Sequence, residues 1–240
     1  MSEPKSRKEQ VRLMFDNIAH KYDFLNHFLS AGIDKGWRKK LVKMVQHHQP
    51  QHTLDVATGT ADLAIALARK TKTPITGIDI SNGMLEIGRE KLKKLKLDHQ
   101  IVLQQADSEN LPFDDQTFDA VMVAFGVRNF ETLDKGLKEM FRVLKPGGML
   151  AVLEFSKPRK FPVKQLYNFY FKYILPMLGR LISKDKAAYT YLPESVGQFP
   201  DGKLFLDRLE LCGYTNNAEK RLTFGIATIY TGFKAYYVSN

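Results

Sequence analysis

The chain of 240 residues is poor in cysteine and in long apolar runs. Its one cysteine, Cys212, excludes an internal disulfide and fits a reducing compartment. No run approaches the roughly 20 apolar residues that a helix needs to cross a bilayer. Acids and bases occur throughout residues 1–30, so no signal peptide is expected there. These absences predict a cytoplasmic protein.

A metal-ligand pattern is also missing. The six histidines include the adjacent pair His47-His48, but none forms a recognisable ligand set with cysteine or acidic residues. The adjacent pair is most simply explained as solvated surface, and no metal site is predicted.

The net charge of +10 is concentrated in two segments. Residues 1–50 hold ten Lys/Arg against five Asp/Glu, and residues 156–186 hold eight against one. The rest of the chain is nearly balanced. Such basic segments attract nucleic acid, anionic lipid or an acidic partner, and charge alone does not choose among them.

The pattern of apolar segments predicts a single α/β domain over residues 1–240. Buried strands are expected at 53–57, 75–80, 101–105, 118–125 and 149–155, with helices at 62–69, 83–95 and 133–144. Parallel strands need crossovers of this kind, so the sheet is expected to be mostly parallel. A helix at 202–211 and two β segments at 214–221 and 223–235 predict an antiparallel hairpin at the sheet edge. Residues 1–50 are expected to form a helical cap, and residues 156–186 a basic, aromatic-rich insertion.

The loop after the first predicted strand has the composition of a ligand-binding turn. In Asp55-Val-Ala-Thr-Gly-Thr-Ala-Asp62, small residues let the backbone turn sharply and approach a ligand. The next helix points its N-terminal N–H groups to the same place. Asp55, Gly59 and Thr60 are therefore candidate binding residues, although strand–helix packing would explain the loop as well.

Polar groups also follow the second and third predicted strands. Asp79 stands 24 residues after Asp55, where a carboxylate can accept both ribose hydroxyls of a nucleoside. Asp107, with Ser108 beside it, can accept a hydrogen bond from an adenine amine. The alternatives are a helix N-cap for Asp79 and a loop cap for Asp107. Together the three strand ends predict an adenosine site.

The residues of the loop favour S-adenosylmethionine over a dinucleotide. A pyrophosphate normally lies against G-x-G-x-x-G, and the loop lacks the second and third glycines. A sulfonium with an amino-acid tail needs polar contacts instead, and Asp55 and Thr60 suit its ammonium and carboxylate ends.

Several longer strings resemble one known family, the ubiquinone/menaquinone biosynthesis C-methyltransferases (UbiE/MenG family). The resemblance covers about residues 10 to 235 and implies the class I methyltransferase fold, a Rossmann-like sandwich. Its most specific parts are Phe125-Gly-Val-Arg-Asn129 and Leu153-Glu-Phe-Ser-Lys-Pro158. The other matching strings are Phe15–Asp23, Asp55–Asp62, Asp79-Ile80, Met84-Leu85, Ala106–Phe113, Arg142–Gly148 and Tyr189–Phe199.

The resemblance implies a cofactor, a reaction and a set of site residues. Thr60, Asp79, Asp107 and Ser108 match the family's cofactor-binding positions. Ala124 departs from members that have serine there, so it offers no hydroxyl to the cofactor. The implied reaction methylates a ring carbon of a polyprenylated quinol, demethylmenaquinol to menaquinol. The alternative acceptor is the 2-polyprenyl-6-methoxy-1,4-benzoquinol of ubiquinone biosynthesis.

Three residues at family-matching positions are candidates for the chemical step. Arg128 is too basic to be a base itself, but it can stabilise a phenolate or orient a water that removes the proton. Asn129 and Tyr22 would position the quinol oxygens. The structural alternatives are an ion pair for Arg128, a helix cap for Asn129 and amphipathic packing for Tyr22.

The insertion suits a membrane surface, where a long isoprenoid tail resides. Residues 161–173 hold six aromatic side chains within a basic segment, and such amphipathic elements bind the bilayer interface. Peripheral membrane association is therefore expected. A lid, or a helix at a homodimer interface, would bury the same residues.

Two other functions are compatible with the basic segments. One is methylation of RNA or another small molecule, and the other is a binding module with a degenerate cofactor fold. The chain has neither an Asn/Asp-Pro-Pro-Tyr motif for amino-group methylation nor a recognisable RNA-binding module, so no nucleic-acid partner is predicted.

Overall fold

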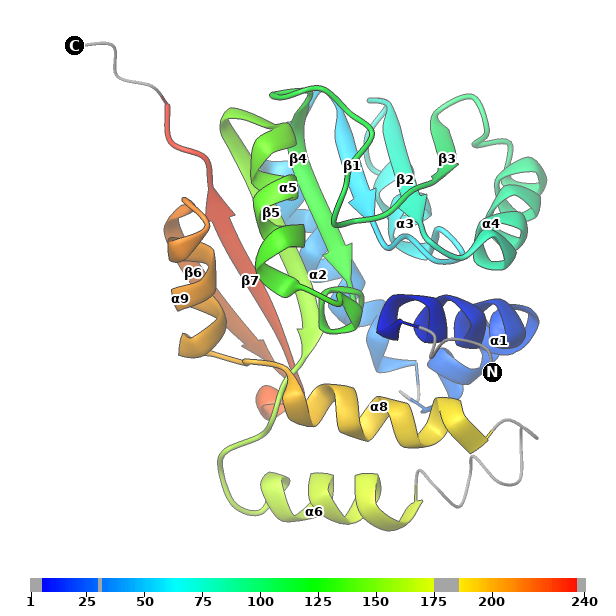
Figure 1. Cartoon of the computed structure of the whole chain (residues 1–240), viewed down its shortest axis with the longest axis vertical. Coiled ribbons are helices and arrows are strands. Elements are labelled where there is room, and N and C mark those ends of the chain that lie inside the picture. The colour runs from blue at the N-terminus through cyan, green and yellow to red at the C-terminus, as the bar shows by residue number, and fades with distance from the viewer. Residues whose placement is uncertain (1–5, 30–31, 175–185, 237–240) are drawn as a thin grey trace.

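The computed structural model describes residues 6–29, 32–174 and 186–236, with side chains placed for all of them except 21–29, 171–172 and 186–190. Seven strands form one sheet: β1 (Thr53–Val56), β2 (Ile75–Asp79), β3 (Ile101–Gln105), β4 (Phe118–Ala124), β5 (Leu144–Phe155), β6 (Thr215–Leu222) and β7 (Ala227–Phe233). Their order is β3-β2-β1-β4-β5-β7-β6 (Figure 1). The first five strands are parallel, and β7 and β6 complete the edge as an antiparallel hairpin. The predicted mixed sheet is confirmed.

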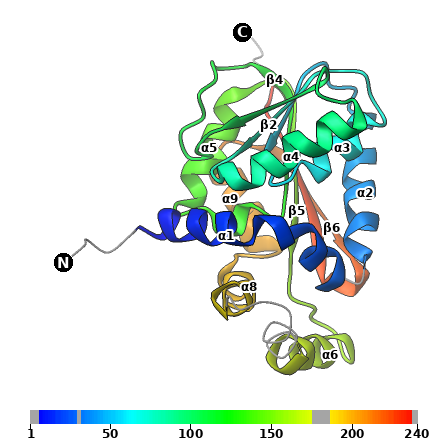
Figure 2. The ribbon, with the colours of Figure 1, turned by 90° about the vertical axis from the view of Figure 1, so that its right-hand side faces the viewer.

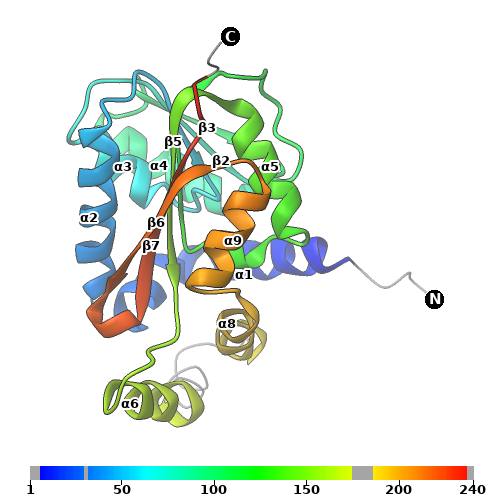
Figure 3. The ribbon, with the colours of Figure 1, turned by 90° about the vertical axis from the view of Figure 1, so that its left-hand side faces the viewer.

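Helices cover both faces of the sheet. The helices are α1 (Arg7–Leu29), α2 (Ile33–His47), α3 (Asp62–Ala68), α4 (Asn82–Leu95), α5 (Leu133–Val143), α6 (Val163–Phe169), α8 (Lys186–Gln198) and α9 (Lys203–Leu211). Figure 3 shows α2 and α3 on one side of the sheet and α5 and α9 on the other. The helices expected between the strands are therefore present, with bounds within one or two residues of those predicted.

The central strands are mostly apolar because both of their faces are buried. Along β4, Ala120 and Met122 pack with the core under α2 and α3. Val121 and Val123 point to the core under α5 and α9. Successive side chains of a strand alternate between faces, so a strand covered on both sides is apolar at most positions.

Strand β5 differs from the prediction at its start. The fifth strand was expected to begin at Met149, but β5 begins at Leu144. Leu144 pairs with Phe118 and Met149 with Ala120, so the Lys-Pro-Gly-Gly segment forms a bulge against β4. Gly147 has a φ of 79°, which glycine adopts without strain. The Pro-Gly-Gly composition predicts a turn, but the bulge uses the same backbone freedom.

Three helices lie beyond the carboxyl ends of the parallel strands. Figures 1 and 2 show α1 next to the sheet, with α8 and then α6 further out. Helix α1 is attached to the start of α4, because the Asp16 carboxylate accepts hydrogen bonds from Ser81 Oγ (2.6 Å) and Gly83 N (3.1 Å). Helix α1 therefore covers the end of the sheet where α/β proteins bind ligands, whereas α2, from the same predicted cap segment, packs on a face of the sheet.

Candidate cofactor and acceptor site

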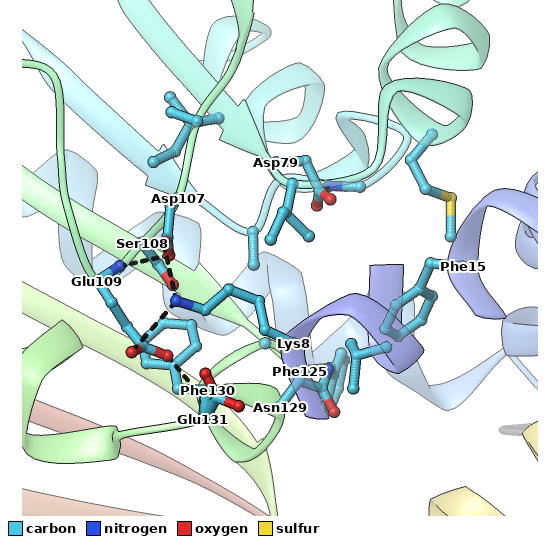
Figure 4. Close-up of a pocket in the computed structure, with 18 of the residues that line it drawn as sticks. Lys8, Phe15, Asp79, Asp107, Ser108, Glu109, Phe125, Asn129, Phe130 and Glu131 are labelled. Atoms are coloured by element: carbon cyan, nitrogen blue, oxygen red, sulfur yellow. Dashed lines mark hydrogen bonds and ion pairs between the residues drawn. The ribbon is translucent and has the colours of Figure 1, made fainter. Parts of the chain in front are cut away.

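A cavity of about 700 Å³, its open mouth included, lies beyond the ends of β1 to β4 (Figure 4). One wall comes from α1 through Lys8, Val11 and Phe15. The strand ends and the loops after them supply most of the remainder: Ala57, Gly59, Ile78, Asp79, Ile80, Ala106, Asp107, Ser108, Glu109, Ala124, Phe125, Gly126, Asn129, Phe130 and Glu131. We call this space the main cavity.

Asp79 connects two strand ends at the main cavity. Its Oδ2 accepts a hydrogen bond from Gly59 N and its Oδ1 from Ser81 N, both at 2.9 Å. Desolvation raises the pKa of Asp79 to about 6, although these hydrogen bonds lower it. The N-cap of α4 is Ser81, whose Oγ accepts from Met84 N. A carboxylate has about four acceptor positions, so Asp79 retains capacity for two ribose hydroxyls.

Asp107 is held by both its own loop and α1. Its Oδ1 accepts from Glu109 N at 2.9 Å, as expected of a loop cap. Lys8 Nζ lies 2.7 Å from Asp107 Oδ2 and 3.4 Å from Glu109 Oε2. These contacts are visible in Figure 4. Lys8 was not predicted as a site residue, because nothing in the sequence relates it to a loop 99 residues away.

Asp55 and Thr60 line a smaller pocket next to the main cavity. The two spaces share Ala57, Gly59 and Ala124 in their walls. Ala57, Gly59 and Ala61 all have φ between 53° and 67°, a left-handed conformation that turns the loop between the two spaces. Of the predicted binding residues, Gly59, Asp79, Asp107 and Ser108 thus line the main cavity, while Asp55 and Thr60 lie on the other side of the loop.

Asp55 is the group in this pocket that most clearly fits a cationic ligand. It is 1% exposed, and Thr58 Oγ1 donates to its Oδ2 at 2.7 Å. Its Oδ1 is buried without a hydrogen-bond partner within the described residues. Burial raises the pKa of Asp55 to about 7. A buried acceptor without a partner is costly, and an ammonium group would satisfy it.

Asn129 is the candidate reaction residue that lines the main cavity. It ends the short helix η1 (Val127–Asn129) after β4. Tyr191 Oη, from α8, donates to Asn129 Oδ1 at 2.9 Å. With its oxygen held by Tyr191, the amide nitrogen of Asn129 is the group available to donate to a ligand.

Arg128 is held away from the main cavity by a buried carboxylate. Its Nη1 lies 2.8 Å from Glu154 Oε1 and also donates to the Phe125 carbonyl oxygen. Glu154 is fully buried, and its guanidinium partner stacks 5.5 Å from the centroid of the Phe155 ring. Arg128 borders a separate small pocket with Arg7 and Ser195. The ion pair considered as an alternative is present, and the catalytic role of Arg128 stays a prediction.

The structure adds Glu154 and Tyr191 to the candidate residues of the site. Glu154 has a sequence signal, because an acid within the apolar segment 149–155 needs a partner. Tyr191 has none, because nothing in the sequence relates it to Asn129. Tyr22 lies in α1, but its side chain is not among those described.

Solved structures share this fold. The [4+2]-cyclase SpnF matches with a TM-score of 0.70 at 17% identity, over 98% of both chains. An S-adenosylmethionine-dependent methyltransferase from Thermotoga maritima matches with a TM-score of 0.63 at 18% identity, over 93% of this chain and 99% of that one. These likenesses show the fold alone: the Rossmann-like sandwich of the class I methyltransferases.

Comparison of the amino-acid sequence with known proteins identifies the family as well as the fold. The model of the ubiE/COQ5 methyltransferase family matches residues 3–234, so the chain belongs to that family and is an S-adenosylmethionine-dependent methyltransferase. A demethylmenaquinone methyltransferase of Bacteroides fragilis is 48% identical over 95% of this chain and 94% of its own. One from Porphyromonas gingivalis is 45% identical over the same shares. A ubiquinone/menaquinone biosynthesis C-methyltransferase UbiE of Geotalea daltonii is 47% identical over 94% of this chain and 97% of its own.

Proposed function

We propose that the protein transfers the methyl group of S-adenosylmethionine to a ring carbon of a polyprenylated quinol, converting demethylmenaquinol to menaquinol. The observation that carries this proposal is the 45–48% identity to demethylmenaquinone methyltransferases over nearly the full length of both chains. The cavity fits such a reaction, because polar groups at the strand ends suit the nucleoside and aromatic and apolar side chains line the rest.

The residues near Asn129 supply what carbon methylation needs. S-adenosylmethionine supplies an electrophilic methyl group when bound. A ring carbon attacks it only after the neighbouring hydroxyl has lost its proton, because the phenolate pushes electron density to the ortho carbon. The ring carbon would then bond to the methyl carbon while the methyl–sulfur bond breaks, with S-adenosylhomocysteine as the leaving thioether. Loss of the ring C–H proton would restore the aromatic ring. Asn129 would donate to the quinol oxygen, with Tyr191 fixing the orientation of the amide.

Arg128 does not line the main cavity, so it would stabilise a phenolate at Asn129 as a nearby charge and not by direct contact. It directly precedes Asn129, and the stacked Phe155 ring and the Glu154 carboxylate hold its guanidinium in place. Desolvation raises the pKa of Glu154, although the charge of Arg128 lowers it. A fixed cation in a water-poor site stabilises developing negative charge more strongly than water does.

Cells that lack the protein test the proposed acceptor. Mass spectrometry of their lipid extract should show a menaquinone precursor that is lighter by one methyl group, and the intact gene should restore menaquinone. Accumulation of a benzoquinone precursor instead would assign the alternative acceptor, in line with the name of the Geotalea relative. An unchanged quinone profile would contradict both.

We also propose that the outer side of α6 contacts an anionic membrane. Phe161, Leu166, Phe169 and Tyr173 are each at least 55% exposed, and Lys160 and Lys164 are exposed beside them. We call these six residues the α6 surface. Helix α6 lies furthest from the sheet in all three ribbon views. Exposed aromatic side chains with lysines suit the headgroup region, and no described helix is long and apolar enough to span a bilayer.

Sedimentation with phosphatidylglycerol vesicles tests this contact. The double variant Phe161→Ser/Phe169→Ser should lose most vesicle binding, about tenfold or more, because two exposed aromatic side chains no longer bury area in the interface. Leu204→Ser/Leu211→Ser removes equally exposed apolar residues from α9 and should bind vesicles as the wild type does. If the α6 variant keeps its vesicle binding but changes a dimer to a monomer, the α6 surface is a homodimer interface instead.

A further inference from the structure

The smaller pocket beside the main cavity is lined by a positively charged side chain, Arg38, to which no role has been assigned. The pocket is open to solvent, and Arg38 from α2 is the one basic residue among the described residues that line it. Asp55, Thr60 and Asp62 form part of the same wall. A ligand whose nucleoside lies against Asp79 would extend past the loop at Gly59 to reach these groups.

Arg38 is buried and held in place. It is 9% exposed, and its Nη1 donates to Asp34, one helical turn earlier in α2. Asp62 Oδ2 lies 4.0 Å from the same nitrogen. The guanidinium carbon is 5.7 Å from the centroid of the Phe125 ring, which lines the main cavity. Arg38 is thus oriented before a ligand arrives.

The guanidinium has donors left for a ligand. Arginine has five N–H donors, and the bond to Asp34 is the one hydrogen bond that Arg38 makes within the described residues. A planar guanidinium matches the geometry of a carboxylate, and charge-assisted bonds of this kind are strong. The pocket therefore combines a cationic donor in Arg38 with a buried carboxylate oxygen in Asp55 that lacks a hydrogen bond.

We propose that Arg38 binds the carboxylate of the methionyl group of S-adenosylmethionine, with Asp34 as the positioning residue that orients the guanidinium. Asp55 then faces the ammonium of the same group, so the two charges of the amino acid meet opposite charges. Thr60, which the sequence suggested for the carboxylate, is neutral and accepts a hydrogen bond from Lys91 Nζ at 3.1 Å. The inference concerns the cofactor and does not depend on the quinol.

Calorimetry with two ligands tests the proposal without measuring turnover. The ligands are S-adenosylhomocysteine and its analogue without the carboxylate. In the wild type, removing the carboxylate from the ligand should weaken binding about 10- to 100-fold, the value of a charge-assisted hydrogen bond. Arg38→Gln should weaken binding of S-adenosylhomocysteine by a similar factor and leave the analogue's affinity within about twofold, because the two changes remove the same interaction.

Further variants separate a binding role from a structural one. Asp34→Asn should weaken the binding of S-adenosylhomocysteine less than Arg38→Gln does. Arg38→Lys should give an intermediate loss of affinity, because lysine keeps the charge but not the planar guanidinium group. Arg89→Gln on α4, whose arginine pairs with Glu86 near the surface, is the matched control and should bind both ligands normally.

Three outcomes would overturn the proposal. If Arg38→Gln weakened the binding of both ligands equally, Arg38 would have a structural role. Equal affinity of the wild type for both ligands would mean that nothing in the protein binds the carboxylate, and this comparison needs no variant to fold. Normal binding of S-adenosylhomocysteine by Arg38→Gln would place the carboxylate elsewhere. If the wild type bound neither ligand, the cofactor itself would be in doubt.

Discussion

The two halves of the site are built differently. The proposed cofactor half contains Asp55, Asp79 and Asp107, which each lie within two residues of the end of a parallel strand. The proposed acceptor half contains Arg128, Asn129, Glu154 and Tyr191, which come from η1, β5 and α8. The cofactor half is therefore positioned by the sheet itself, whereas the acceptor half depends on contacts between distant segments.

The electrostatics of the two halves differ as well. In the cofactor half, burial raises the pKa of Asp55 and Asp79. A positively charged or hydrogen-bonding ligand would stabilise their ionised forms. In the acceptor half, Arg128 and Glu154 neutralise each other within the protein. Substitutions in the cofactor half should therefore act mainly on ligand binding. Substitutions in the acceptor half should act on both turnover and stability.

The largest effect is expected from Asp79→Ala. We expect about a 1000-fold loss of affinity for S-adenosylhomocysteine, because two charge-assisted hydrogen bonds to the ribose are lost together with the bond to Gly59 N. Calorimetry measures this loss. Asp119→Ala is the matched control, because Asp119 also accepts backbone N–H bonds but stands at the opposite end of the sheet. A loss below about tenfold for Asp79→Ala would contradict the assignment of the ribose site.

Arg128→Ala should affect turnover but not cofactor binding, and so distinguish the two halves of the site. Turnover should fall about 100-fold, as when an enzyme loses one oxyanion donor, while cofactor affinity stays within about twofold. The free energy of unfolding should fall by about 3–5 kcal/mol, because Glu154 is left buried without its partner. Steady-state kinetics and denaturant unfolding measure these effects.

The double variant Arg128→Ala/Glu154→Gln is the control for stability. It should recover part of the lost stability, because no buried charge remains, but none of the lost turnover. Recovered turnover would mean that Arg128 serves only to neutralise Glu154. Equal losses of turnover and cofactor affinity in Arg128→Ala would remove Arg128 from the acceptor half.

A smaller effect is expected from pH. With a pKa of about 7, Asp55 is mostly protonated at pH 6 and mostly ionised at pH 7.5. Since a ligand ammonium favours the ionised form, affinity for S-adenosylhomocysteine should rise about five- to tenfold over this range. Asp55→Asn should remove this rise. A rise that persists in the variant would assign it to another group.

The same pKa has a consequence for the stability of the free protein. The folded-state pKa of Asp55 lies above its ordinary value of 3.8, so the folded state binds the proton more tightly than the unfolded state does. The contribution of Asp55 to the free energy of unfolding should therefore decrease as the pH rises from about 4 to about 7 and stay constant above that. Thermal unfolding of the wild type and of Asp55→Asn across this range measures it.

The strand ends that line the main cavity were largely predictable from the sequence, because the strands have clear apolar patterns. Asp79 and Asp107 could be placed once the strands before them were recognised, since parallel strands bring their carboxyl ends to one edge. The structure also shows local bonds at both residues, because Asp79 accepts from Gly59 N and Asp107 from Glu109 N.

The site residues that were not predicted depend on tertiary contacts, which leave no local pattern in the sequence. Lys8 reaches Asp107 across 99 residues, and Tyr191 reaches Asn129 across 62. Arg38 lies in a helix whose sequence indicates only amphipathic packing. The bulge at 145–148 shows the same limit within one strand, because Pro and Gly mark a break in regular structure but not its form.

Transfer of a labelled methyl group tests the central claim most directly. The purified protein is incubated with trideuteromethyl S-adenosylmethionine and a short-chain demethylmenaquinol, and the product is examined by tandem mass spectrometry and NMR. We expect the intact CD3 group on the ring carbon next to a hydroxyl, with no product from Asp79→Ala. A CD3 group on a quinol oxygen, or no transfer by the wild type, would contradict the account.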